Sequence, residues 1–455
     1  MPSTKSINPY NNQVIQSFDL YSDSDVSSIL TEADNTYQTY KKTSFEERAI
    51  LMNRAADILD QNRNRYAETM TLEMGKPLHS ALAEVDKCAW VCRYYADNAA
   101  KFLADEEVKT DASKSMITYR PLGTILAVMP WNYPFWQVFR FAAPTLMAGN
   151  VGLLKHASNV PQSALNIEEV FREAGFPEYV FTTLLIKSDQ VKAILDSPYV
   201  KAATLTGSGP AGGAVASQSG EKIKKTVLEL GGSDPYLVLE DADLDHAAEQ
   251  CTSSRLLNAG QSCIGAKRFI VLEEVYEEFL NVFTKKMGSA IMGDPMQNVD
   301  LGPMARYDLR DEVHAQVIES INKGATLILG GHIPESEGAF YPPTILANVK
   351  PGMPAYHDEI FGPVASVIKV KDENEAIRIA NDTEFGLGAC VFTKDLERGE
   401  RIAREELEAG SCFVNQYVKS DPRLPFGGIN TSGYGRELSY YGIREFVNIK
   451  TLYIK

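Results

Sequence analysis

The chain has 455 residues, of which 44% are hydrophobic and 23% are charged, as in an ordinary globular protein. This length exceeds what one hydrophobic core usually serves, so two or three domains are expected. The formal net charge of −15 and the scattered basic residues argue against nucleic acid or an anionic membrane as a partner. The sequence begins without a signal-peptide pattern and has no stretch of roughly 18 apolar residues that would span a membrane. We therefore expect a cytoplasmic protein.

Six cysteines fit a reducing compartment better than a disulfide framework. Cys88 and Cys92 are four residues apart in an expected helix, but no further ligands stand at a suitable spacing for a metal. Buried structural thiols are the simpler interpretation, and no metal site is expected.

Apolar positions recur at helical spacing through residues 24–105, and a polar segment with an expected hairpin turn at 111–113 follows. From residue 123 onward, short apolar runs alternate with helical segments, which is typical of a parallel sheet with crossover helices. The expected strands are 125–129, 151–154, 180–185 and 202–205, and the expected helices are 163–174 and 188–196.

A second alternating region runs from residue 231 to about 413. Its expected strands are 268–272, 326–329 and 365–370, and its expected helices are 275–287 and 306–323. The last segment, 446–454, has the alternation of a strand. A terminal strand has unpaired edges, so it is a candidate for pairing across a subunit interface.

A glycine-rich segment, GSGPAG at 207–212, follows an expected strand and opens an expected helix. Glycines there let a phosphate approach the positive end of a helix, so the segment indicates nucleotide binding. The pattern also requires an acidic residue about twenty positions on. Glu229 lies seventeen residues past Gly212, and it can be a ribose ligand or a catalytic base.

Two further segments suggest covalent catalysis: GQSC at 260–263 and LELGG at 228–232. The first places the thiol of Cys263 on a glycine-flanked turn, before a segment expected to be helical. The second places the carboxylate of Glu229 before two glycines. Such backbone lets a nucleophile and a base project into a cleft. The alternative for Cys263 is a buried core thiol.

Seven ordered segments together resemble the NAD(P)-dependent aldehyde dehydrogenase superfamily over essentially the whole chain. They are PWNYP at 130–134, LK at 154–155, TGS at 206–208, LELGG at 228–232, GQSC at 260–263, EIFGP at 359–363 and PFGG at 425–428. Within the superfamily, LLKHASN at 153–159 and GRELS at 435–439 resemble the bacterial succinate-semialdehyde dehydrogenases.

The resemblance implies a role for each matching position. Cys263 would attack the aldehyde carbon, Asn132 and the Cys263 backbone N–H would stabilise the oxyanion, and Glu229 would activate water to hydrolyse the thioester. The expected cofactor-binding residues are Trp131, Lys155, Ser158, Gly207, Ser208, Gly212, Leu230, Glu359 and Phe361.

The cofactor is expected to be NADP or NAD. Many NAD-preferring relatives have Glu three residues after the lysine that corresponds to Lys155, whereas this chain has Ser158. A carboxylate there would repel a 2′-phosphate, while a hydroxyl can donate a hydrogen bond to it. The neighbouring His156 can be a further cation or an inert side chain.

The resemblance also implies that Arg140 and Ser420 bind a substrate carboxylate. Arg140 lies within an apolar stretch, where a charge must be paired; its partner can be the substrate or an acidic residue of the chain. Relatives with a second arginine before the Cys motif differ here, because the residue is Leu257. Gly265 replaces the second cysteine of relatives that form a redox-switch disulfide, so no such switch is expected.

The expected fold class is α/β, like that of aldehyde dehydrogenases. A Rossmann-type cofactor domain would cover 1–105 and 122–230, an α/β catalytic domain 231–430, and a β-strand oligomerisation element with the C-terminal segment 106–121 and 431–455. The expected function is oxidation of succinate semialdehyde to succinate by a homodimer or homotetramer. The alternatives are an enzyme for uncharged aldehydes and a catalytically silent cofactor-binding protein.

Overall fold

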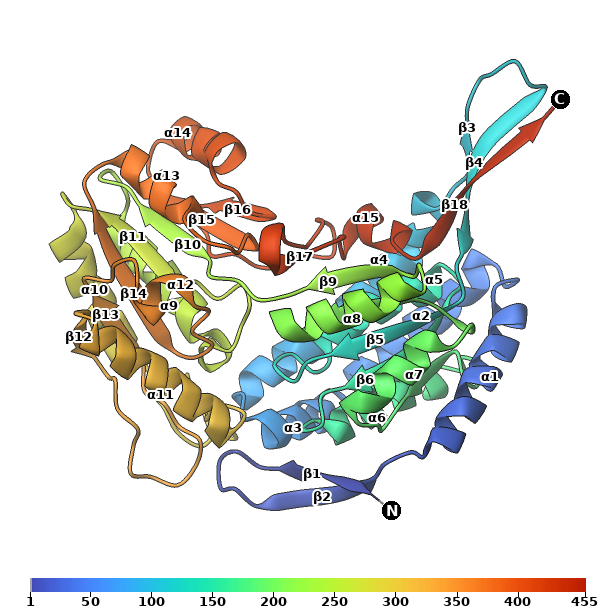
Figure 1. Ribbon diagram of the computed structural model, residues 1–455, viewed down its shortest axis with the longest axis horizontal. Coiled ribbons are helices and arrows are strands. Elements are labelled where there is room, and N and C mark those ends of the chain that lie inside the picture. Colours follow the sequence, from blue (N-terminus) through green and yellow to red (C-terminus); the bar gives the residue numbers. More distant parts are fainter. Residues whose placement is uncertain (1) are drawn as a thin grey trace.

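The computed structural model describes residues 2–455, which fold around two large, mainly parallel β-sheets lying side by side (Figure 1). None of the helices in this part of the chain is both long and apolar enough to cross a membrane. The mixed α/β architecture expected from the alternating pattern is confirmed.

Four helices precede the first sheet: α1 (Asp23–Tyr40), α2 (Phe45–Gln61), α3 (Arg63–Met74) and α4 (Leu78–Phe102). The sequence determines where the first two helices begin, because Ser22 and Ser44 are their N-cap residues. Three residues after each cap stands an acidic residue, and its side chain accepts the backbone N–H of the capping serine. The α3 helix ends at Gly75, whose φ of 83° is readily adopted only by glycine.

The first sheet has the strand order β17-β9-β8-β5-β6-β7, and all neighbours except β17 and β9 are parallel. Its strands are β5 (Thr124–Met129), β6 (Val151–His156), β7 (Phe181–Thr183), β8 (Val200–Thr206), β9 (Lys225–Glu229) and β17 (Gly433–Tyr434). The connecting helices are α5 (Trp136–Met147), α6 (Pro161–Glu173), α7 (Val191–Asp196) and α8 (Gly209–Glu221).

Both faces of this sheet are buried, which explains its nearly continuous apolar strands. In β5, Ile125 and Ala127 face a core formed with α2 to α6, whereas Leu126 faces a second core with α1 and α7. The strand order also creates a crevice: from β5 the chain adds β6 and β7 on one side, then returns to add β8 and β9 on the other. Ligands bind at the carboxyl ends of strands at such a reversal.

The second sheet has the order β12-β13-β14-β11-β10-β15-β16, and only the edge strand β12 is antiparallel to its neighbour. Its strands are β10 (Pro235–Val238), β11 (Arg268–Leu272), β12 (Thr326–Leu329), β13 (Thr344–Ala347), β14 (Val364–Val370), β15 (Gly388–Phe392) and β16 (Ser411–Val414). Its helices are α9 (Leu244–Leu256), α10 (Tyr276–Gly288), α11 (Tyr307–Asn322), α12 (Pro354–His357), α13 (Glu373–Asn381) and α14 (Leu396–Arg401).

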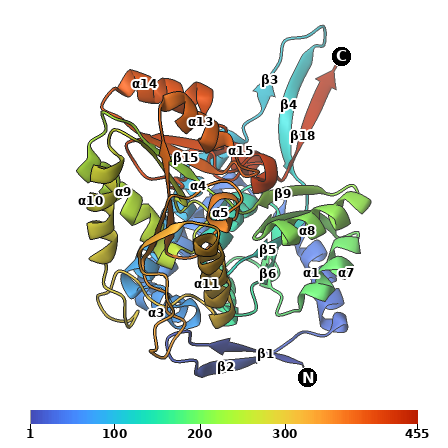
Figure 2. The same cartoon turned by 60° about the vertical axis from the view of Figure 1, so that its left-hand side comes forward.

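Two smaller sheets extend from opposite ends of the body (Figures 1 and 2). The hairpin β1 (Ser3–Ile7) and β2 (Val14–Asp19) was not predicted. At the other end, β3 (Glu106–Glu107) and β4 (Lys114–Pro121) form the predicted hairpin, and β18 (Val447–Ile454) pairs antiparallel with β4 after the short helix α15 (Ser439–Arg444). One edge of β18 has no strand beside it among residues 2–455.

Candidate active site

Several of the predicted site residues lie at or just beyond strand ends of the first sheet. Trp131 and Asn132 follow β5, Ser158 follows β6, and Gly207 follows β8. Because these strands are parallel neighbours, their carboxyl ends meet at one edge. The loops that enter β11 and β14 of the second sheet bring Cys263, Glu359 and Phe361 to the same place.

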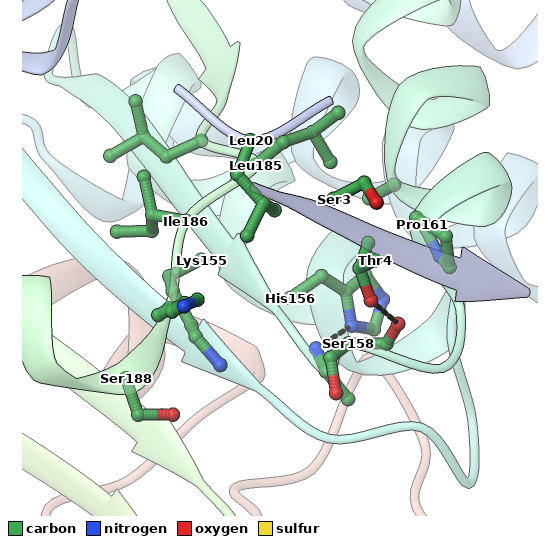
Figure 3. Close-up of a pocket in the computed structure, with 14 residues that line it drawn as sticks. Ser3, Thr4, Leu20, Lys155, His156, Ser158, Pro161, Leu185, Ile186 and Ser188 are labelled. Atoms are coloured by element: carbon green, nitrogen blue, oxygen red, sulfur yellow. Dashed lines mark hydrogen bonds between the residues drawn. The ribbon is translucent and has the colours of Figure 1, made fainter. Parts of the chain in front are cut away.

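A first cavity of about 240 Å³ lies over the end of β6 (Figure 3). Lys155 and Ser158 line it, and Thr4 of the unpredicted hairpin closes one side, where its hydroxyl donates to the Ser158 carbonyl at 3.1 Å. Burial lowers the pKa of Lys155. Within residues 2–455 its ammonium has no hydrogen-bond or ion-pair partner, so it is available to a ligand.

The contacts of His156 argue against a role as a cation. Its Nδ1 accepts the backbone N–H of Ala157 at 2.9 Å, so Nε2 is the nitrogen that donates to the Pro134 carbonyl, also at 2.9 Å. Burial lowers the pKa of His156 to about 4, and the ring is therefore neutral at physiological pH. It fixes the loop after β5 and supplies no charge.

A second cavity of about 280 Å³ lies over β5 and β8. The predicted residues that line it are Trp131, Asn132, Gly207, Ser208, Leu230, Cys263, Glu359 and Phe361. The Trp131 and Phe361 rings meet edge to face, with centroids 5.9 Å apart. Gly212 does not line it; it lies inside α8, where a Cβ would overlap the Leu230 side chain, so the visible reason for glycine is close packing.

A third cavity of about 330 Å³ lies on the other side of the thiol. Cys263 and Gln137 line both this cavity and the second one. Arg140 and Ser420, the two predicted substrate-binding residues, also line it. Four aromatic residues, Tyr133, Trp136, Tyr417 and Phe426, form part of the remaining wall, together with charged and aliphatic side chains. The thiol therefore stands between two compartments.

The loop before Cys263 has unusual backbone. Asn258, Ala259 and Gly260 all have left-handed φ values, of 55°, 52° and 73°. Such a conformation is uncommon for a non-glycine residue and is strained for alanine. At Gly260 a Cβ would overlap the Gly362 carbonyl of the neighbouring loop. The expectation of a helix after Cys263 was wrong: residues 268–272 form β11, and the adjacent helix, α9, precedes the thiol.

The thiol is half-buried, and this burial raises the pKa of Cys263 to about 12, although the positive charges of Lys267 and Arg140 act in the opposite direction. The Lys267 ammonium donates to the carbonyls of Ser262 and Cys263 at 2.8 and 2.7 Å. It also pairs with Glu359 at 3.2 Å. Lys267 thus links the Cys263 loop to the loop that holds Phe361.

The Asn132 amide is oriented by two neighbours. Its oxygen accepts from Gln137 Nε2 and its nitrogen donates to the Gln261 carbonyl, both at 3.1 Å. The second N–H of the amide has no acceptor in the described chain, and the same holds for the backbone N–H of Cys263. Two free donors beside a thiol can stabilise the oxyanion formed when that thiol adds to a carbonyl.

Glu229 is the last residue of β9 and is only 2% exposed. Neither carboxylate oxygen has a hydrogen-bond partner in residues 2–455. Burial raises the pKa of Glu229 well above its usual value, while Arg140 lowers it and the nearby carboxylate of Glu437 raises it further. A carboxylate with a raised pKa is a stronger base than an exposed one.

Arg140, on α5, forms a buried ion pair with Glu437, and its guanidinium lies over the Phe426 ring at 4.6 Å. The alternative of an internal acidic partner is therefore present in the structure. Removing Arg140 would leave a buried carboxylate without its partner, which typically costs about 3–5 kcal/mol of stability. Ser420 accepts a hydrogen bond from Lys87 at 2.8 Å.

The sequence reasoning missed several residues of the site: Lys87, Gln137, Gln261, Lys267 and Glu437. Lys267 had a signal in the sequence, since it is a charged residue directly before an apolar strand. Gln261 lies inside a recognised motif, and its side chain accepts the Ala305 backbone N–H at 2.9 Å. Glu437 lies in the GRELS segment at 435–439, but nothing local indicates its ion pair, because its partner is almost three hundred residues away in the chain.

Comparison with known proteins identifies relatives along the full length. The sequence model of the aldehyde dehydrogenase family matches residues 2–452. A probable NADP+ succinate-semialdehyde dehydrogenase from Synechocystis is 53% identical over 450 residues, covering 99% of both chains. The NADP+ succinate-semialdehyde dehydrogenase 1 of Mycobacterium tuberculosis is 49% identical over 453 residues, again covering 99% of both.

Among solved structures, the succinic semialdehyde dehydrogenase of Streptococcus pyogenes in complex with NADP+ superposes with a TM-score of 0.97. It is 41% identical and covers 99% of each chain. The similarity thus extends to the arrangement of both sheets.

The raised pKa of Cys263 predicts slow alkylation of the ligand-free protein at neutral pH. Below the pKa the thiolate fraction increases about tenfold per pH unit, so labelling by iodoacetamide should accelerate steeply from pH 7 to 9.5. The substitution Lys267→Met should slow labelling at each pH, because it removes a positive charge that favours the thiolate. Peptide mass spectrometry at Cys263 measures the rate.

The variant Lys285→Met, which removes an exposed lysine, is the control. Its Cys263 thiol should be labelled at the wild-type rate. A labelling rate that does not change across this pH range would contradict the assignment, because it would mean that the thiolate is already formed at pH 7.

Proposed function

Because the chain belongs to the aldehyde dehydrogenase family, we propose that it oxidises succinate semialdehyde to succinate with NADP+ and water. The observation that supports this most strongly is the position of Cys263 between two cavities. One continues the nucleotide crevice of a parallel sheet, and the other contains basic side chains that suit a carboxylate. The solved relative with NADP+ bound and the two curated relatives agree with this substrate and cofactor.

The residues of the first cavity fit the phosphorylated ribose of NADP+. The unpaired Lys155 ammonium supplies positive charge, and the Ser158 side chain can donate to a 2′-phosphate. Gly207 and Ser208 precede α8, whose N-terminal N–H groups favour a pyrophosphate. Trp131, Leu230, Glu359 and Phe361 would border the nicotinamide end in the second cavity. When bound, the cofactor accepts the hydride.

The Cys263 thiol loses its proton to water, and the resulting thiolate forms the bond to the aldehyde carbon while the carbonyl electron pair moves to the oxygen. The free N–H of Asn132 and the backbone N–H of Cys263 hold the resulting oxyanion. After hydride loss the substrate is a thioester on Cys263. Glu229 then takes a proton from water, which releases the acid and restores the thiol. Arg140 provides a positive charge near the carboxylates of Glu229 and Glu437 and near the substrate.

We also propose a cofactor domain at 1–105 and 122–230 and a catalytic domain at 231–430, a division supported by the presence of one large sheet in each. We further propose that residues 106–121 and the C-terminal strand join subunits into a homodimer or homotetramer. Four large apolar side chains of β18, Ile449, Leu452, Tyr453 and Ile454, are exposed, and one edge of the strand is free. The six free cysteines support a cytoplasmic location.

The assay of this function follows NADPH formation at 340 nm with succinate semialdehyde, propanal and benzaldehyde. The semialdehyde should give a kcat/KM at least about 100-fold higher, because its carboxylate adds charge-assisted hydrogen bonds that the others lack. Cys263→Ser should abolish turnover, whereas Cys412→Ser, at another half-buried thiol, should not. Equal rates with all three aldehydes would instead favour the enzyme for uncharged aldehydes, and no turnover would favour the silent cofactor-binding protein.

The substitution Ser158→Glu should reverse the cofactor preference. A carboxylate would repel the 2′-phosphate of NADP+ and could accept the 2′-hydroxyl of NAD+, so the kcat/KM ratio of NADP+ to NAD+ should fall at least about 100-fold. Ser188→Glu adds the same charge at an exposed position of the same cavity. If both variants lower the ratio equally, Ser158 has no specific contact with the phosphate.

The proposed interface predicts that Ile449→Asp weakens the assembly, because it places a charge on an apolar surface that an oligomer would bury. Light scattering should give the wild type a mass at least twice the 50.3 kDa of one chain, and the variant a mass near that of the single chain. Ile291→Asp is a matched control, since Ile291 is 60% exposed and Ile449 is 63% exposed. A monomeric wild type would refute the proposal.

A further inference from the structure

The third cavity contains a lysine that no motif identified. Lys87 lies on α4, and its ammonium donates to the Ser420 hydroxyl at 2.8 Å and lies 4.2 Å from the centroid of the Trp136 ring. Within the described chain, no carboxylate is close enough to form an ion pair with it. A cation that is largely withdrawn from water and lacks a counter-ion is costly, so the cavity favours an anion at this point.

The other two buried cations of this cavity already have acidic partners. Arg140 pairs with Glu437, and Lys76 pairs with Glu84. Glu84 is one helical turn from Lys87, but one of its oxygens faces Lys76 and the other accepts the backbone N–H groups of Phe135 and Trp136, each at 2.9 Å. Glu84 is thus occupied in fixing the loop after β5. Lys419 also borders the cavity, but it is exposed.

The electrostatic surroundings agree with this geometry. The pKa of Lys87 is lowered to about 8, mainly by burial and then by the charge of Arg140, although Cys88, Glu84 and Asp421 act to raise it. These are the titratable groups that face it from α4, from α5 and from the segment after β16. A bound carboxylate would favour the protonated lysine.

We propose that Lys87 binds the carboxylate of the substrate and, together with Ser420, selects for the charged aldehyde. Ser420 accepts its hydrogen bond from Lys87, so its own O–H can donate to the same carboxylate. Lys87 provides the second cation that Leu257, which also borders this cavity, cannot provide. This inference rests on the proposed function, because it names the group that recognises the acid end of succinate semialdehyde.

The test compares succinate semialdehyde with its methyl ester, methyl 4-oxobutanoate, which has the same aldehyde but no charge. The measured quantity is the ratio of kcat/KM for the acid to kcat/KM for the ester, in the NADP+-saturated enzyme. In Lys87→Met this ratio should fall about 10- to 100-fold, mainly through a higher KM for the acid, since one charge-assisted hydrogen bond is lost. Lys87→Arg retains the charge and should keep most of the selectivity.

The exposed Lys419, which also borders the cavity, provides a matched control. In Lys419→Met the ratio of kcat/KM for the acid to that for the ester should stay within about threefold of the wild-type ratio. The pH dependence gives a second readout. In the wild type the KM for the acid should rise with pH above about 8 as Lys87 loses its proton, while the KM for the ester stays level. In Lys87→Arg this rise should disappear, because a guanidinium remains protonated.

Four results would separate the possibilities. A selective wild type whose selectivity survives in Lys87→Met overturns the role of Lys87 and leaves the proposed function standing. Equal losses for acid and ester in Lys87→Met show a structural role, and a control variant that loses as much selectivity shows a general effect of charge; both overturn the inference. A wild type that does not prefer the acid overturns the proposed function, and the assignment of Lys87 falls with it.

Discussion

The site depends on a short set of hydrogen bonds that joins the loop after β5 to the loop before β11. Asn132 donates to the carbonyl of Gln261, and Asn258 donates both to that carbonyl and to the carbonyl of Asn132. These contacts connect the carboxyl edge of one sheet with the amino end of a strand in the other. Without them, the loop that holds the thiol and the loop that holds the Asn132 amide would have no such hydrogen bonds between them.

The strained backbone of this loop follows from the same connection. Asn258 and Ala259 adopt left-handed angles, whose cost is offset by the hydrogen bonds of the Asn258 amide and by the close approach of Gly260 to Gly362. Lys267 stabilises the loop by donating hydrogen bonds to the carbonyls of Ser262 and Cys263. The position of Cys263 is thus determined by three sets of contacts: those of the Asn258 amide, those between Gly260 and Gly362, and those of Lys267.

Much of the fold could be predicted because apolar periodicity is a local property of the sequence. The pattern correctly places the strands 125–129 and 268–272 and the helices that connect the strands of both large sheets. The terminal strand is confirmed as β18. The hairpin of β1 and β2 was missed because most of its side chains are exposed and it has no apolar run. The helix expected after Cys263 was wrong because a glycine-rich turn can precede a strand as easily as a helix.

Within the site, residue types in known motifs could be located, but their partners could not. The partner of Arg140 lies in the distant segment before α15, and Ser420 meets Lys87 across 333 positions of the chain. Such pairs leave no periodic signal in the sequence. His156 illustrates the same limit, because only the contacts with Pro134 and Ala157 show that the ring is neutral.

The two ends of the chain are not equivalent as points of attachment. Thr4 contacts the backbone of Ser158 beside the first cavity, whereas the last strand projects from the opposite end of the body (Figure 1). A fluorophore attached at the start of β1 would therefore lie beside the first cavity and could report on its occupancy. The same group at the C-terminus would instead test whether the projecting strand tolerates added bulk.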